Sequence, residues 1–177
     1  LKKTEISAVC HRRKTATGGS IAFASSRFLI FINALKENFM PKRNKPLLPY
    51  TPKNVALVSQ SIKRNETTDL LQKQHIEINK RRNGFAFCHT DSGASYIIFG
   101  SQNLKMMRAK DNQGIYHWWV ADNDNNIIDL TAQQYSASEL KQLYANGEKS
   151  GLLGFRYRPR VMTMVQRVCQ DLGLKVA

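Results

Sequence analysis

Apolar residues recur at helical spacing in several stretches of the chain, and at strand spacing in a region between them. The first clear helical stripe is Val55, Val58 and Ile62. It follows Thr51-Pro52, a capping residue with a proline at the first helical position. This pattern predicts a helix from Pro52 to about residue 63.

The same kinds of signal place further elements along the chain. Helices are predicted over about 68–82, from just after Cys88 to Gly100, from Ser138 to about Ala145, and from Pro159 onward. Strands are predicted over 104–109, Ile115 to Ala121 and Ile127 to Thr131, with a turn-forming run from Asp122 to Asn126 between the last two. This order predicts an α+β fold with helices packed on a small antiparallel sheet.

The first part of the chain differs in character from the rest. Residues 1–39 hold seven Lys or Arg and two acidic residues, with a Ser/Thr/Ala-rich stretch and a short amphipathic segment at 28–39. Four prolines between 41 and 52 then predict an extended connector. We therefore expect 1–39 to be a basic, peripheral or loosely ordered N-terminal extension, and 40–177 to be a single catalytic-type domain.

Charge is the strongest feature of the composition. The 177 residues include 27 Lys or Arg against 13 Asp or Glu, which gives a net charge of +14. Such a field attracts polyanions without implying a specific site. The basic residues occur in small clusters, and no helix-turn-helix signal, aromatic RNP-like strand or Cys/His finger spacing accompanies them. The charge predicts weak, non-specific contact with nucleic acid.

Cysteine content bears on the redox compartment of the protein, and hydropathy on membrane association. Cys10, Cys88 and Cys169 are too few and too scattered for a disulfide scaffold or a zinc ribbon, and they suit a reducing compartment such as the cytoplasm. No apolar run reaches the roughly 18 residues that cross a bilayer, so no membrane partner is expected. The oligomeric state is left open by the sequence.

The predicted strand pair brings a histidine and a carboxylate together. A turn at 122–126 pairs Ala121 with Ile127 in an antiparallel hairpin. His117 and Asp129 are then diagonal neighbours on one face, with Cα atoms about 7–8 Å apart. One residue more or less in the turn would place them on opposite faces. The spacing is compatible with an orienting Asp–His pair.

Cys88 supplies a candidate nucleophile. It stands just ahead of a predicted helix, where unpaired backbone N–H groups and the helix dipole stabilise a thiolate. A nearby imidazolium would lower the pKa of the thiol further. Together with His117 and Asp129, Cys88 completes a nucleophile, base and orienter of the kind used in acyl transfer.

The segment from His117 to Thr131 (HWWVADNDNNIIDLT) resembles the core signature of the transglutaminase-like branch of the papain-like cysteine hydrolases. That branch has a nucleophilic cysteine upstream at a helix start, as Cys88 is. The wider stretch resembles a set of small uncharacterised phage and prophage proteins, through Asp129 to Tyr135 and the approach from Gly154 to Arg160. The resemblance covers roughly 45–170.

This resemblance implies a papain-like or transglutaminase-like core and a thiol-dependent hydrolase or acyltransferase. The substrate would be an amide or isopeptide bond in a protein or peptide-like molecule, and the enzyme a peptidase, amidase, deamidase or transglutaminase. Cys88 is then the nucleophile, His117 the general base and acid, and Asp129 the orienter, with Trp119 in support. No metal or organic cofactor is needed, and a phage-encoded protein would act in the host cytoplasm.

Two features depart from the family pattern. Phe87 stands where the phage set carries a histidine before the cysteine, and His89 follows the cysteine instead. No glutamine occupies the place of the papain-like oxyanion donor. Asn83 is a substitute candidate, together with the backbone N–H of Cys88.

Other interpretations use the same residues. Cys88, His89, His117 and Asp129 are all residue types that bind zinc, although an adjacent Cys-His pair is poor ligand spacing. The aromatic residues offer a stacking platform for single-stranded nucleic acid, but strand alternation assigns half of them to the core. These aromatic residues are Tyr116, Trp118 and Trp119. A further alternative is a non-catalytic nucleic-acid-associated or protein-binding module on the same fold.

Overall fold

The computed structural model describes residues 45–81, 84–150 and 158–174. Within these residues the fold is α+β, with helices packed on a four-stranded antiparallel sheet. This class of fold agrees with the prediction from the sequence. The predicted extension 1–39, with its short helix, lies outside the described residues.

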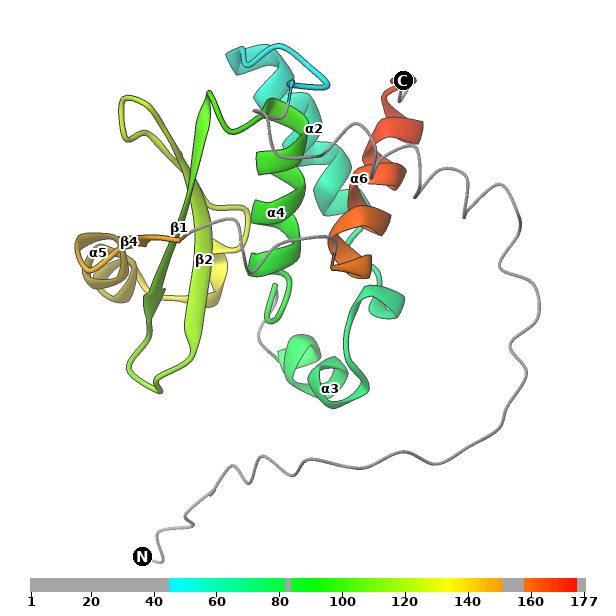
Figure 1. Cartoon of the computed structure of the whole chain (residues 1–177). Coiled ribbons are helices and arrows are strands. Elements are labelled where there is room, and N and C mark those ends of the chain that lie inside the picture. The colour runs from blue at the N-terminus through cyan, green and yellow to red at the C-terminus, as the bar shows by residue number, and fades with distance from the viewer. Residues whose placement is uncertain (1–44, 82–83, 151–157, 175–177) are drawn as a thin grey trace, which may run out of the picture.

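The sheet lies between two helical layers (Figure 1). The helices are α2 (Pro52–Arg64), α3 (Lys73–Arg81), α4 (Cys88–Phe99), α5 (Ala137–Ala145) and α6 (Pro159–Asp171). The strands are β1 (Leu104–Lys110), β2 (Tyr116–Asp122), β3 (Ile127–Ile128) and β4 (Glu148–Lys149). Helix α4 packs on one face of the sheet with α2 and α6 against it, and α5 covers the other face. Among the described residues, no helix has the length and apolar character needed to span a membrane.

Local sequence signals account for the helix ends. The side chain of Thr51 accepts a hydrogen bond from the backbone N–H of Asn54 at 3.2 Å, and Pro52 opens α2, as predicted. Pro159 likewise opens α6. Gly100 ends α4 with a φ of 80°, a conformation that a glycine adopts without strain.

The predicted continuous helix over 68–82 is wrong. The chain forms a single 3-10 turn at Thr68–Leu70, becomes extended at Leu71, and starts α3 only at Lys73. Leu70 and Leu71 are both buried, whereas no residue of α3 is. The chain thus buries Leu70 and Leu71 in the segment ahead of α3, where the backbone at Leu71 is extended.

The third strand is shorter than predicted, because pairing stops at Ile128. Immediately afterwards the Asp129 side chain accepts hydrogen bonds from Thr131, and this bends the chain away from the ladder. Helix α5 begins one residue earlier than expected. Ser136 caps it in a reciprocal capping box with Glu139.

The strand order is β3-β2-β1-β4. Ala121 pairs with Ile127, which confirms the predicted hairpin register. Because side chains alternate along β2, Trp118 and Val120 face the α4 layer and His117 and Trp119 face α5.

Two hydrophobic clusters follow from this alternation. The larger one joins α4, α6 and α2 to the sheet, and the smaller one lies under α5. Fully buried members of the larger cluster include Ile62, Ile98, Phe99, Leu104, Met106, Val120 and Met164. The smaller cluster contains Ala109, Trp119 and Leu143. Helix α4 is buried on nearly every side and packs on the two central strands, β2 and β1.

The turn between β2 and β3 is closed by one carboxylate. Asp122 accepts hydrogen bonds from the backbone N–H groups of Asp124 (2.9 Å) and Asn126 (2.8 Å). It also accepts from the Asn126 side chain (2.9 Å) and from the Tyr50 hydroxyl (3.1 Å). The Asn126 amide is the main reason that the pKa of Asp122 lies below its ordinary value.

The substitution Asp122→Asn should lower the melting temperature at pH 7, because the amide accepts fewer and weaker hydrogen bonds across the turn. Folding lowers the pKa of this carboxyl. Its stabilisation of the folded state is therefore complete above the pKa of the unfolded chain, about 4, and is lost as the pH falls through the lower pKa of the folded protein. The difference from wild type should therefore shrink on acidification below about pH 4. Thermal melts followed by circular dichroism measure it.

Asp124→Asn is the matched control, since it removes the same charge from the same turn while the backbone N–H of residue 124 remains. An equal loss of melting temperature in both variants would show that the Asp122 bonds do not hold the turn.

Candidate functional site

His117 packs against aromatic residues of the smaller cluster. Its side chain is 0 % exposed, on the face of β2 that looks toward α5. The ring stacks on Trp119 at 5.8 Å between centroids and meets the Tyr135 ring edge-on at 4.8 Å. Trp119 therefore packs against the imidazole ring, and its predicted supporting role stays a prediction.

The His117 ring is hydrogen-bonded to Asp129, as the strand register predicts. Nε2 of His117 lies 2.6 Å from Oδ2 of Asp129. The Tyr144 hydroxyl donates to the same oxygen at 2.9 Å. The other oxygen, Oδ1, accepts from the backbone N–H (3.0 Å) and the hydroxyl (3.1 Å) of Thr131. The carboxylate therefore has donors on both oxygens.

These donors determine the charge of the pair. Burial alone raises the pKa of Asp129, but the His117 hydrogen bond and the donors from Thr131 and Tyr144 outweigh it, so the pKa lies below its ordinary value. An ionised Asp129 only accepts hydrogen bonds, so Nε2 of His117 must carry the proton. In a neutral ring this leaves a lone pair on Nδ1.

That second ring nitrogen is the unusual feature of the site. Nδ1 of His117 is buried and has no hydrogen-bond partner within the described part of the chain. A buried polar atom without a partner costs roughly 1–3 kcal/mol, and such atoms are rare in folded proteins. An unpaired basic nitrogen on an oriented imidazole is the arrangement that a general base requires.

Cys88 is the first residue of α4 and is 9 % exposed. Burial raises the pKa of its thiol to about 12, although hydrogen bonding from the backbone of Trp118, and more weakly of His89, opposes the shift. The lowered pKa that the sequence predicts is therefore wrong for the resting protein. The start of this helix is enclosed, so the cost of burying a thiolate exceeds the help from the N–H groups.

The structure places Cys88 beside the pair without joining it to His117 by a hydrogen bond. The sulfur lies against the backbone of Trp118, the residue that follows His117 in β2. The His117 side chain points to the α5 face, whereas Cys88 belongs to the helix on the other face. The assignment of the three residues as a catalytic triad stays a prediction.

Asn83 and His89 are the other residues that the sequence singles out near the His117–Asp129 pair. Asn83, the candidate oxyanion donor, lies outside the described residues. The His89 ring meets the Trp118 ring at 5.1 Å, on the face away from His117. Burial, helped by the Arg158 and Arg160 cations, lowers the pKa of His89 to about 4. In the chain as described, no three His, Cys, Asp or Glu side chains form a group suited to a metal ion, so the zinc alternative gains no support.

Sequence reasoning missed two parts of the site. Tyr144 reaches Asp129 from α5, and its only sequence signal is its place on the inward stripe of that helix. Asp91, in the first turn of α4, is buried without any apolar pattern to indicate it. Burial, followed by the neighbouring Glu66 carboxyl, raises the pKa of Asp91 well above its ordinary value.

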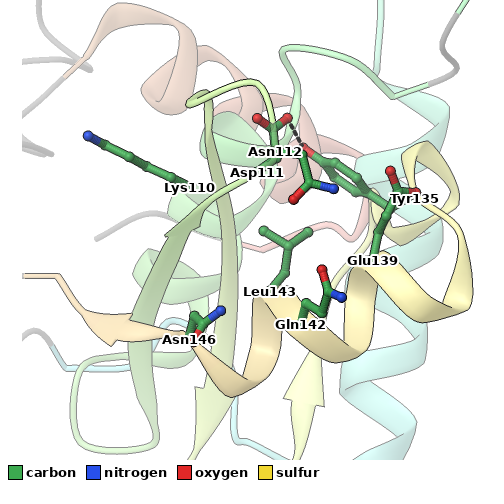
Figure 2. A pocket seen from close by; sticks show the side chains of 8 residues that line it. All are labelled: Lys110, Asp111, Asn112, Tyr135, Glu139, Gln142, Leu143 and Asn146. Carbon is green, nitrogen blue, oxygen red and sulfur yellow. Dashed lines mark hydrogen bonds between the residues drawn. The ribbon is translucent and has the colours of Figure 1, made fainter.

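A small pocket of about 50 Å³ lies on the α5 side of the sheet. Figure 2 shows it between the end of β1 and α5, with Asp111, Tyr135, Glu139 and Gln142 around it. The Tyr135 hydroxyl donates to Asp111 at 3.3 Å, and the same ring contacts His117. The Tyr135 ring thus separates His117 from this pocket.

Comparison with known proteins adds no relative: no family model matches the chain, and neither a curated protein nor a solved structure matches it at a significant level.

The neutral state of the thiol can be tested by alkylation. In the folded protein at pH 7, iodoacetamide should modify Cys88 and Cys169 slowly, because burial raises their pKa values to about 12 and about 11. The Cys88 rate should keep rising as the pH increases beyond 9, and denaturant should accelerate both reactions. Peptide mass mapping assigns each modified cysteine. A fast Cys88 reaction that levels off near pH 7 would instead indicate a resting thiolate.

Proposed function

We propose that the protein is a thiol-dependent hydrolase or acyltransferase that acts on an amide or isopeptide bond. The observation that carries this proposal is the 2.6 Å hydrogen bond from His117 to Asp129, which leaves Nδ1 of the imidazole basic and unpaired. Cys88, beside the next residue of the same strand, is the nucleophile. The proposal includes a transglutaminase-like core with this nucleophile at the start of α4.

The chemistry follows from these groups. As the Cys88 sulfur attacks the substrate carbonyl, Nδ1 of His117 takes the thiol proton and a tetrahedral intermediate forms. The imidazolium then gives that proton to the leaving amine as the carbon–nitrogen bond breaks, and a thioester remains on Cys88. Water, or a second amine, attacks the thioester with His117 again as the base, and the free thiol returns.

Asp129 acts through His117 rather than on the substrate. Its ionised carboxylate stabilises the imidazolium that forms in the first step, and its hydrogen bond holds the ring in the tautomer with a basic Nδ1. Because the pKa of Asp129 is below its ordinary value, this support persists into mildly acidic solution. The Tyr144 hydroxyl holds the carboxylate in turn.

The raised pKa of Cys88 favours general-base catalysis over a preformed thiolate–imidazolium pair. A neutral thiol has to lose its proton at the moment of attack. This requires the sulfur and Nδ1 to come within hydrogen-bond distance when substrate binds. We further propose a cytoplasmic setting, in keeping with the free thiols of Cys88 and Cys169.

An electrophilic substrate mimic tests the proposal. A biotinylated peptide in which a vinyl sulfone replaces the scissile amide should label Cys88, and Cys88→Ala should abolish labelling. His117→Ala should slow labelling by about 10²- to 10⁴-fold, the usual range for loss of a general base. Asp129→Asn should have a smaller effect, because Asp129 acts through His117, and Tyr144→Phe the smallest, because Tyr144 acts only through Asp129. Avidin blots and peptide mass mapping give the rates.

His75→Ala is the matched control, because it removes an imidazole from α3, outside the candidate site. Circular dichroism establishes that each variant is folded. If Cys88 is labelled as fast in His117→Ala as in His75→Ala, His117 is not the base and the proposed function is wrong.

A further inference from the structure

One end of the β1–β2 hairpin carries an aromatic and cationic surface on the α4 face of the sheet. Arg108 pairs with Trp118, and Lys110 pairs with Tyr116, in the antiparallel register. Side chains at paired positions share a face, so these four residues form one patch. We call it the hairpin strip, and its four residues lie next to the turn that joins β1 to β2.

The four side chains of the hairpin strip are stacked on one another. The Arg108 guanidinium lies 4.6 Å from the centre of the Tyr116 ring and 5.6 Å from that of Trp118. The Lys110 ammonium lies 5.4 Å from the Tyr116 ring. The two aromatic rings are 6.3 Å apart between centroids. The strip therefore places two positive charges on β1 against two aromatic rings on β2.

Exposure distinguishes the hairpin strip from the core. Tyr116 is 38 % exposed, Trp118 is half-buried and Lys110 is exposed, whereas Trp119 on the other face is buried. Helix α4 covers the inner part of the same face. The large apolar side chains of the sheet there are Leu104, Met106 and Val120. Tyr116 is thus the more exposed ring of the pair, whereas Trp118 exposes only part of its ring and also packs against the larger cluster.

The surroundings of the strip are positive. The Arg158 and Arg160 cations act on His89, whose ring lies against Trp118. Glu148 pairs with Arg108 at 2.8 Å and neutralises part of the local charge. The chain as a whole carries +14. A polyanion with flat apolar groups complements this combination.

We propose that the hairpin strip binds single-stranded nucleic acid, with bases stacked on Tyr116 and Trp118 and phosphates near Arg108 and Lys110. Unpaired bases expose the π-faces that aromatic rings and guanidinium planes stack on, whereas a duplex hides them. An acidic peptide would use the charges of the strip but leave its rings without partners. This binding goes beyond the proposed thiol chemistry and does not depend on it.

Titration of the full-length protein with a short oligothymidylate tests the strip. Quenching of tryptophan fluorescence should report binding through Trp118, because Trp119 is buried on the other face. Tyr116→Leu should weaken binding roughly five- to hundred-fold with little change in salt dependence, since it removes one stacking surface. Arg108→Gln should weaken binding and reduce the slope of log K against log salt by roughly 0.7, one phosphate contact.

Lys141→Gln is the matched control, because it removes one exposed positive charge from α5, on the opposite side of the sheet. It should change the affinity much less than Arg108→Gln. If Lys141→Gln and Arg108→Gln weaken binding equally and Tyr116→Leu does not weaken it, binding reflects only the overall positive charge of the protein. That result would overturn the proposal. Competition by polyglutamate as strong as by the oligonucleotide would assign the strip to acidic peptides instead. Cys88→Ser should bind normally, so failure of the thiol chemistry leaves this result unaffected.

Discussion

The carboxylate of Asp122 accepts two backbone N–H groups and an amide across the turn from β2 to β3, and this closure sets the pairing of Ala121 with Ile127. Side chains alternate along a strand, so a slip of one residue would turn Asp129 to the other face of the sheet. The 2.6 Å bond between His117 and Asp129 thus depends on a turn several residues away. The stability of the turn and the geometry of the His117–Asp129 pair are therefore coupled at this point of the fold.

The sheet also separates two electrostatic environments. On the α5 face, Asp129 is buried but stays ionised, because Thr131 and Tyr144 supply donors to both oxygens along with His117. On the α4 side, the Cys88 thiol lacks comparable donors, so burial raises its pKa. Hydrogen bonds outweigh burial at Asp129, whereas burial outweighs the hydrogen bonds at Cys88. A thiol that is protonated at rest avoids the cost of a buried thiolate.

Features governed by short-range patterns could be predicted from the sequence. The Thr51-Pro52 start of α2, the Gly100 end of α4 and the His117–Asp129 face follow from local capping and strand alternation. The break at Leu71, the burial of the Cys88 thiol and the contribution of Tyr144 could not, since each depends on what packs there from far along the chain. Periodicity can be read from a short stretch of sequence. Burial of a side chain, and hydrogen bonds from residues far along the chain, are determined only when the helices pack on the sheet.

Trp118 connects the two surfaces on which the proposals rest. Its backbone bonds to the Cys88 sulfur, and its ring forms part of the hairpin strip between Arg108 and His89. The two proposed sites therefore share one strand, which also carries His117 at the preceding position. Because side chains alternate along β2, the ring of Trp118 and the imidazole of His117 project to opposite faces of the sheet. The same alternation that orients the base toward α5 thus keeps it apart from a ligand on the hairpin strip.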